Sequence, residues 1–178
     1  MYLKSLILIL TLTITLSAHG HESIVDSVSV EYGSGNKTNL LRVALQNNWS
    51  APVWRFSKSQ IDGYWDFSLA QWRGRRYQQM DRHQWITAIG VTPVFRWQKS
   101  ERRGLYGELG IGAYLLSDLY NNNGRRFSTR FQFGDHIGMG YRWDQAEFGL
   151  RFQHFSNAGI KKPNHGVNFF TIRYAQQF

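Results

Sequence analysis

A histidine and a serine stand two residues apart near the end of the chain, at positions 154 and 156. The large apolar residues Phe148, Leu150 and Phe152 precede them at the same spacing. Because residues i and i+2 of a β-strand point to the same side, His154 and Ser156 are predicted to share an otherwise apolar face. A serine needs a base to act as a nucleophile at neutral pH, and histidine is the usual one, so the spacing points to nucleophilic catalysis.

The spacing alone is a weak signal, since a histidine and a serine in an interfacial loop also solvate lipid headgroups. The residues that follow strengthen it. Asn157, Ala158 and Gly159 come directly after the serine, and glycine permits a tight turn whose N–H groups would face an oxyanion. The segment is therefore a candidate hydrolase site.

The composition narrows the class of protein. The chain has 178 residues, enough for one domain, and is basic, with 21 Lys and Arg against 12 Asp and Glu. The absence of cysteine excludes disulfides and thiolate metal sites, and the six histidines lack metal-ligand spacing. A mean hydropathy of −0.43 argues against a helical membrane protein. We expect no metal, no cofactor and, without a basic stripe on a soluble module, no nucleic acid.

The first 20 residues predict a signal peptide. Lys4 supplies the positive charge, residues 6–16 are apolar but too short to span a bilayer as a helix, and Ala18-His19-Gly20 resembles a cleavage site. A membrane anchor is the less favoured alternative, because no second apolar block follows. We expect residues 21–178 to form a single domain in a Gram-negative envelope.

Alternation with a period of two recurs along this domain and predicts β-strands. The eight predicted strands cover residues 24–33, 40–48, 60–72, 84–98, 105–115, 127–143, 147–156 and 166–178.

This pattern fits two architectures, a soluble barrel with its apolar face inward and an outer-membrane barrel with its apolar face toward lipid. Residue size decides between them. One face carries large rings and leucines, too bulky for the interior of eight strands, whereas the other carries small residues and paired charges. The predicted fold class is therefore all-β, an eight-stranded antiparallel transmembrane β-barrel that is filled rather than a pore. Strand-end aromatics are expected in two interfacial girdles, namely Trp72, Trp85, Trp97, Trp143 and Phe178.

The strand count sets the orientation. With both termini in the periplasm, residues 34–39, 73–83, 116–126 and 157–165 are predicted to be outer loops, and His154 and Ser156 to face lipid at the depth of the outer leaflet. Arginines and lysines crowd these loops, which suits phosphate groups, although basic residues are common at any anionic membrane surface.

The segment His154-Phe-Ser156-Asn157-Ala158-Gly159-Ile-Lys-Lys-Pro163-Asn164-His-Gly166 resembles the outer-membrane lipid A 3-O-deacylases. The resemblance extends through Gly63-Tyr-Trp-Asp66, Thr92-Pro-Val-Phe95, Glu108-Leu-Gly-Ile-Gly112 and Asp135-His-Ile-Gly138. It implies an eight-stranded barrel with a serine-hydrolase site on its lipid-facing side. By this resemblance Ser156 is the nucleophile, His154 the base, and Asn157 and Gly159 part of the oxyanion hole.

The sequence departs from the family at the third member of the triad, where the family's acid falls on Asn168. In a Ser-His-Asp protease, exchange of the acid for its amide lowers kcat by about 10⁴-fold. A two-residue turn at Asp144-Gln145 would pair Asp135 with His154, so Asp135 is a candidate substitute. A different register or a bulge would remove it.

Two functions remain open. The first is an esterase that hydrolyses the 3-position acyl chain of lipid A. The second is a non-catalytic barrel, either a degenerate hydrolase that binds lipopolysaccharide or a small envelope protein, and Asn168 keeps this alternative open. The expected surroundings are lipid A or lipopolysaccharide and the outer membrane, as a single barrel or a homodimer.

Overall fold

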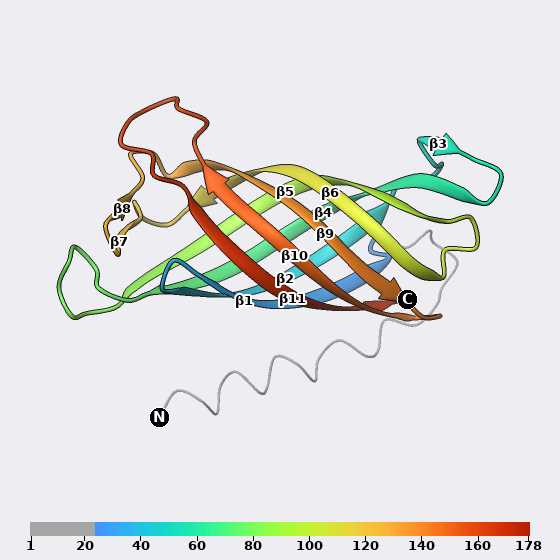
Figure 1. Cartoon of the computed structure of the whole chain (residues 1–178), viewed down its shortest axis with the longest axis horizontal. Helices are drawn as coiled ribbons and strands as arrows, with labels where there is room; N and C mark the ends of the chain where they lie inside the picture. The colour runs from blue at the N-terminus through green and yellow to red at the C-terminus, as the bar shows by residue number, and fades with distance from the viewer. Residues whose placement is uncertain (1–23) are drawn as a thin grey trace.

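The structure is a computed structural model, and it describes residues 24–178. Eight long strands form one antiparallel sheet that closes into a barrel (Figure 1). They are β1 (Ser27–Gly35), β2 (Thr38–Asn48), β4 (Ser59–Gly74), β5 (Gln84–Lys99), β6 (Gly104–Leu116), β9 (Phe131–Arg142), β10 (Ala146–Ser156) and β11 (Val167–Gln177). Three short strands lie in the connections, β3 (Trp54–Arg55), β7 (Asn121–Asn122) and β8 (Arg125–Arg126).

The barrel closes where β1 pairs with β11, from Ser27 opposite Gln177 to Ser34 opposite Phe170. Every other neighbouring pair of long strands is also antiparallel and consecutive along the barrel wall. The predicted fold class is thus confirmed. The predicted signal peptide, residues 1–20, lies outside the described residues. Residues 24–178 contain no helix long and apolar enough to cross a membrane.

The outer face of the barrel is apolar, as the alternation predicts. Leu109 and Ile137, from the neighbouring strands β6 and β9, expose 54% and 66% of their surface, while Glu108 and His136 beside them are buried. Such an apolar surface is stable in contact with lipid hydrocarbon rather than with water. Four of the aromatics expected in the girdles are exposed, namely Trp85, Trp97, Trp143 and Phe178.

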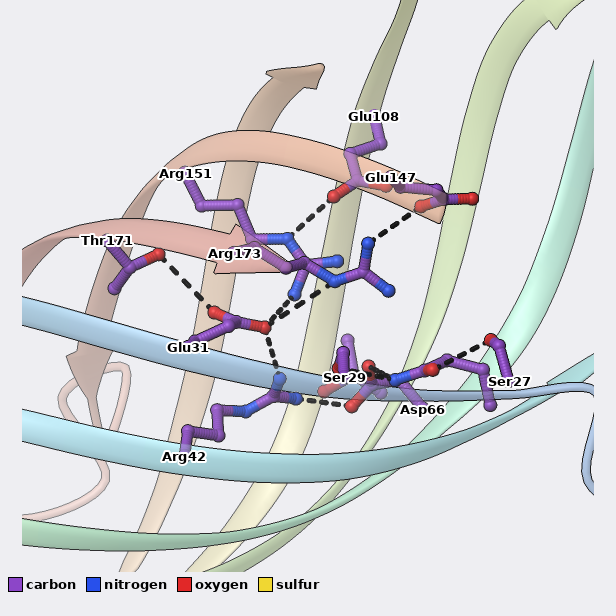
Figure 2. A network of polar contacts seen from close by, with 12 residues as sticks. Ser27, Ser29, Glu31, Arg42, Asp66, Glu108, Glu147, Arg151, Thr171 and Arg173 are labelled. Carbon is purple, nitrogen blue, oxygen red and sulfur yellow. Dashed lines mark hydrogen bonds and ion pairs between the residues drawn. The ribbon is translucent and has the colours of Figure 1, made fainter. Parts of the chain in front are cut away.

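Charged side chains fill the middle of the interior (Figure 2). Arg151 donates to Glu31 and Glu108, each at 2.6 Å, and Arg173 donates to Glu147 at 2.8 Å. Buried charges are tolerated only when they are paired and hydrogen-bonded, so cations and carboxylates pair with one another across the narrow lumen. Other members of this lumen network are Arg42, Tyr64, Asp66 and Arg96.

Two aromatic residues lie where the sequence did not place them. Trp72 was expected in a girdle, but its side chain is buried inside the barrel with 1% exposure, because it shares the inward parity of Tyr64 and Asp66 on β4. The predicted strand 127–143 would begin at Phe127, but β9 begins only at Phe131, and Phe127 is buried against Tyr120. Both rings join an apolar cluster that fills one end of the lumen.

We call this cluster the aromatic plug. Its rings are Trp72, Tyr114, Tyr120, Phe127, Phe155 and Phe169. Trp72 packs on Phe155 at 4.7 Å and on Phe169 at 5.0 Å between ring centroids, in edge-to-face contacts. The plug lies at the end of the barrel that carries the connections β1–β2, β4–β5, β6–β9 and β10–β11, here called the loop end (Figure 1). The opposite end, called the terminus end, joins Phe178 N to Asp26 O at 3.0 Å.

Candidate active site

The C-terminal end of β10 carries both candidate catalytic residues on the outer face. His154 and Ser156 are half-buried, and the side chains between and beside them, Gln153 and Phe155, are buried in the interior. Phe155 belongs to the aromatic plug, so this end of the strand is anchored from inside while it presents the imidazole and the hydroxyl outside. The prediction that His154 and Ser156 lie together on the outer face of the barrel is therefore confirmed.

His154 lies between two strands that each bring one polar residue to it. In the register of the sheet it pairs with Asp135 of β9 and with Asn168 of β11. The predicted pairing with Asp135 is thus confirmed. The hydrogen bond, however, joins His154 Nδ1 to Asn168 Oδ1 at 2.5 Å. Within residues 24–178 the carboxylate of Asp135 makes no hydrogen bond to the imidazole.

This hydrogen bond assigns the proton on the ring. Because the amide oxygen of Asn168 only accepts, His154 Nδ1 is the donor, and Nε2 is left as the basic nitrogen. Gly166 packs against the ring, where a Cβ at this position would be 2.6 Å from His154 Cε1. The imidazole is therefore held by an acceptor and by close backbone packing.

Ser156 ends β10, and its Oγ accepts a hydrogen bond from the N–H of Ala158 at 3.4 Å. In the described part of the chain no hydrogen bond joins this oxygen to His154. Residues i and i+2 of a strand lie about 6–7 Å apart, a gap that side-chain rotation closes, and catalytic hydrogen bonds are often long without substrate. Ser156 thus lies beside the predicted base, His154, without a hydrogen bond to it.

The turn after Ser156 orders the N–H groups predicted to stabilise an oxyanion. Asn157 is fully buried, its N–H donates to Asn164 Oδ1 at 3.2 Å, and its own Oδ1 accepts from Gly159 N at 3.0 Å. Both predicted donors are therefore used within the turn. The N–H that faces the serine oxygen belongs to Ala158, which has a left-handed φ of 53°.

A second loop braces this turn. The amide of Asn157 donates to Thr129 Oγ1 of that second loop at 3.2 Å, and also to Lys161 O of its own loop at 2.8 Å. Arg125 donates from Nη1 to the carbonyls of His165 and Gly166, at 2.6 and 2.9 Å. These contacts between loops could not be predicted from the sequence, because Arg125 lies about 30 residues before His154 and on another loop.

Beneath the loops, Tyr120 donates to or accepts from Thr38 Oγ1 at 2.7 Å. Burial raises the pKa of the Tyr120 phenol, so the hydroxyl stays protonated at neutral pH and keeps this bond between the β6–β9 connection and β2. Residues 24–178 contain no grouping of three His, Cys, Asp or Glu side chains able to hold a metal.

Known proteins of one family resemble this chain along nearly its whole length. Residues 39–177 match the family described as "Lipid A 3-O-deacylase (PagL)". The protein named lipid A deacylase PagL of Bordetella bronchiseptica is 38% identical over 159 residues, which cover 85% of this chain and 83% of that protein. Its namesake in Pseudomonas aeruginosa is 25% identical over 163 residues, or 89% and 90% of the two chains.

A solved structure has the same fold. The crystal structure of the outer membrane enzyme PagL superposes with a TM-score of 0.74 at 25% identity, covering 85% of this chain and 99% of that one.

Proposed function

This chain belongs to the lipid A 3-O-deacylase (PagL) family, and from that premise we propose that Ser156 and His154 hydrolyse the ester-linked acyl chain at the 3-position of lipid A. The observation that supports this role is the Nδ1 to Asn168 Oδ1 hydrogen bond at 2.5 Å, which leaves His154 Nε2 free on the face that Ser156 shares. The family and the barrel place the protein in the outer membrane.

In the proposed reaction His154 Nε2 removes the proton of Ser156 as Oγ attacks the ester carbonyl. The N–H of Ala158, now 3.4 Å from Oγ, donates to the oxyanion. The imidazolium then returns the proton to the sugar oxygen as the C–O bond breaks. Water, deprotonated by the same nitrogen, releases the fatty acid from the acyl-enzyme and restores Ser156.

The half-buried position of the pair on the outer wall supports a substrate that stays in the membrane. The acyl chain would lie along exposed Phe152 and Phe170, which pair on neighbouring strands. We infer that the loop end faces outward, so that the site lies at the depth of the outer leaflet. The signal peptide at residues 1–20 would deliver the chain to that membrane.

Each residue of the proposed site comes from a single barrel, so hydrolysis needs only one copy. The homodimer stays a prediction.

Lipid A from cells that produce the wild type, Ser156→Ala or Ser57→Ala tests the proposal by mass spectrometry. Ser57 is exposed at the terminus end and serves as the matched control. We expect the loss of one acyl-chain mass with the wild type and with Ser57→Ala, and intact lipid A with Ser156→Ala. Deacylation that persists in Ser156→Ala would refute the role of the serine. Intact lipid A in all three strains would favour the alternative, a barrel made inert by Asn168.

A further inference from the structure

A pocket with a volume of about 280 Å³ lies among the loops beside the candidate active site. Its cations are Lys37 of the β1–β2 turn, Arg76 of the β4–β5 connection and Arg125 of β8. The amides of Asn36, Gln79 and Asn123 complete most of the lining, and no carboxylate lines the pocket. Three like charges around one cavity repel one another, so the pocket favours an anion.

The cations of the pocket keep hydrogen-bond donors free. In the described residues Lys37 Nζ has no hydrogen-bond partner, and Arg125 uses only Nη1, which leaves Nε and Nη2 available. Arg76 has one weak partner, the exposed Asp81, at 3.5 Å.

Three other arginines of the loop end bind neighbouring protein groups. Arg73 contacts His83 Nε2 at 2.8 Å, Arg126 donates to Asn121 Oδ1 at 3.1 Å, and Arg130 donates to Leu116 O at 2.7 Å. These arginines hold the loops together.

Backbone contacts join the three loops that line the pocket. Arg75 N donates to Lys37 O at 3.1 Å, and Gln78 N donates to Asn121 O at 2.9 Å. The pocket is therefore a fixed feature between connected hairpins rather than a chance approach of long side chains.

Two hydrogen bonds connect the pocket to the candidate active site. Asn36 Oδ1 accepts from the backbone N–H of Asn168 at 2.8 Å, and Arg125 Nη1 donates to the carbonyl of Gly166 at 2.9 Å. Asn168 binds the imidazole of His154, and Gly166 packs against it. An anion in the pocket would thus lie one residue away from both supports of the base.

We propose that this pocket is a subsite for a phosphate monoester on the sugar headgroup of the lipid substrate. The inference rests on the proposed function and adds to it the part of the substrate that fixes its position. Two arginines and one lysine in the lining suit the charged terminal oxygens of a phosphate. The site would hold the headgroup at the loop end while the acyl ester reaches Ser156 on the barrel wall.

The test compares the wild type with Lys37→Gln/Arg76→Gln in detergent micelles, on lipid A and on lipid A whose phosphates have been removed. Arg55→Gln/Lys58→Gln, exposed at the terminus end, is the matched control. We expect the pocket variant to raise KM for lipid A about tenfold, the range of a lost charged hydrogen bond, with little change in kcat. For the wild type, KM should be about tenfold higher for the dephosphorylated lipid than for lipid A. On the dephosphorylated lipid, the pocket variant should have the same KM as the wild type.

Equal KM values for the two lipids with the wild type would overturn the proposal, as would an equal effect of the control. Binding to the Ser156→Ala barrel, measured by calorimetry in nanodiscs, separates this from the proposed function, because it needs no turnover. Preference of that barrel for the phosphorylated lipid, lost with the added Lys37→Gln/Arg76→Gln changes, supports the subsite. Competition by inorganic phosphate without preference between the lipids would show a free-anion site and would also overturn it.

Discussion

Asn168 differs from a carboxylate in charge but not in the atom that it turns toward His154. Its Oδ1 accepts from Nδ1 at 2.5 Å, so the amide fixes the ring and the tautomer as an acid would. It does not supply the negative charge that would stabilise the imidazolium of the proposed reaction. The sequence predicted that positions 135 and 168 flank His154. The sequence could not predict which of the two residues binds the imidazole. Both pair with His154 in the sheet, so the choice depends on the rotamers of their side chains.

Substitutions at the two flanking residues should therefore have unequal effects. We expect Asn168→Ala to lower kcat by about 10²-fold or more, because the ring loses its acceptor. Asp135→Ala should change kcat by less than about threefold, because its carboxylate makes no hydrogen bond to the ring. Steady-state kinetics on lipid A micelles measure both. A larger loss with Asp135→Ala would show that the aspartate is the partner during catalysis.

The reverse change tests the missing charge. Asn168→Asp keeps the acceptor in place and adds a carboxylate beside the imidazolium, so kcat should rise, by about tenfold or more. The rise should be absent from Asn164→Asp, whose side chain binds the backbone of Asn157 instead of the ring. An unchanged kcat in Asn168→Asp would mean that the amide already suffices.

At the scale of elements, the site depends on the end of one strand and on the loop that returns from it. β10 delivers the pair through simple alternation, which is why the sequence predicted its facing. The loop of residues 157–166 is held by contacts with residues 125–129, which have no signature in the local sequence. Gly166 is the point where this loop meets the imidazole, at a left-handed φ of 63°.

Gly166→Ala should therefore disturb the base. The new Cβ would lie 2.6 Å from His154 Cε1, and we expect kcat to fall at least about tenfold as the ring moves. Gly104→Ala is the matched control, since its φ of 98° is also positive but its Cβ would meet nothing closer than 3.9 Å. Both variants should lose about 1 kcal/mol of stability from backbone strain. Equal kcat values in the two variants would contradict the positioning role of Gly166.

At the scale of the whole molecule, the lumen has two parts. Ion pairs occupy its middle, as the alternation of small and charged residues predicted, and the aromatic plug occupies the loop end. Residue size predicted that large rings would be too bulky for the interior of eight strands. The rings fit because the β6–β9 connection covers that end and contributes Tyr120 and Phe127 to a closed apolar cluster.

Stability should depend on complete pairing in the lumen. Glu108 accepts from Arg151 at 2.6 Å and from Arg96 at 2.8 Å, so Glu108→Ala leaves two buried guanidinium groups short of a partner. We expect a loss of about 3–5 kcal/mol in the free energy of unfolding. Glu101→Ala, which breaks an exposed pair with Lys99 of 3.6 Å, should cost less than about 1 kcal/mol. Urea unfolding in lipid vesicles, followed by tryptophan fluorescence, measures both, and similar losses would contradict this account.

The aromatic plug has a consequence for the membrane around the barrel. Because rings and ion pairs obstruct the axis, neither water nor fatty acid can drain through the protein. Products formed on the wall would have to spread sideways among neighbouring lipids. A bacterium could accumulate many copies without weakening the permeability barrier that its surface lipid provides.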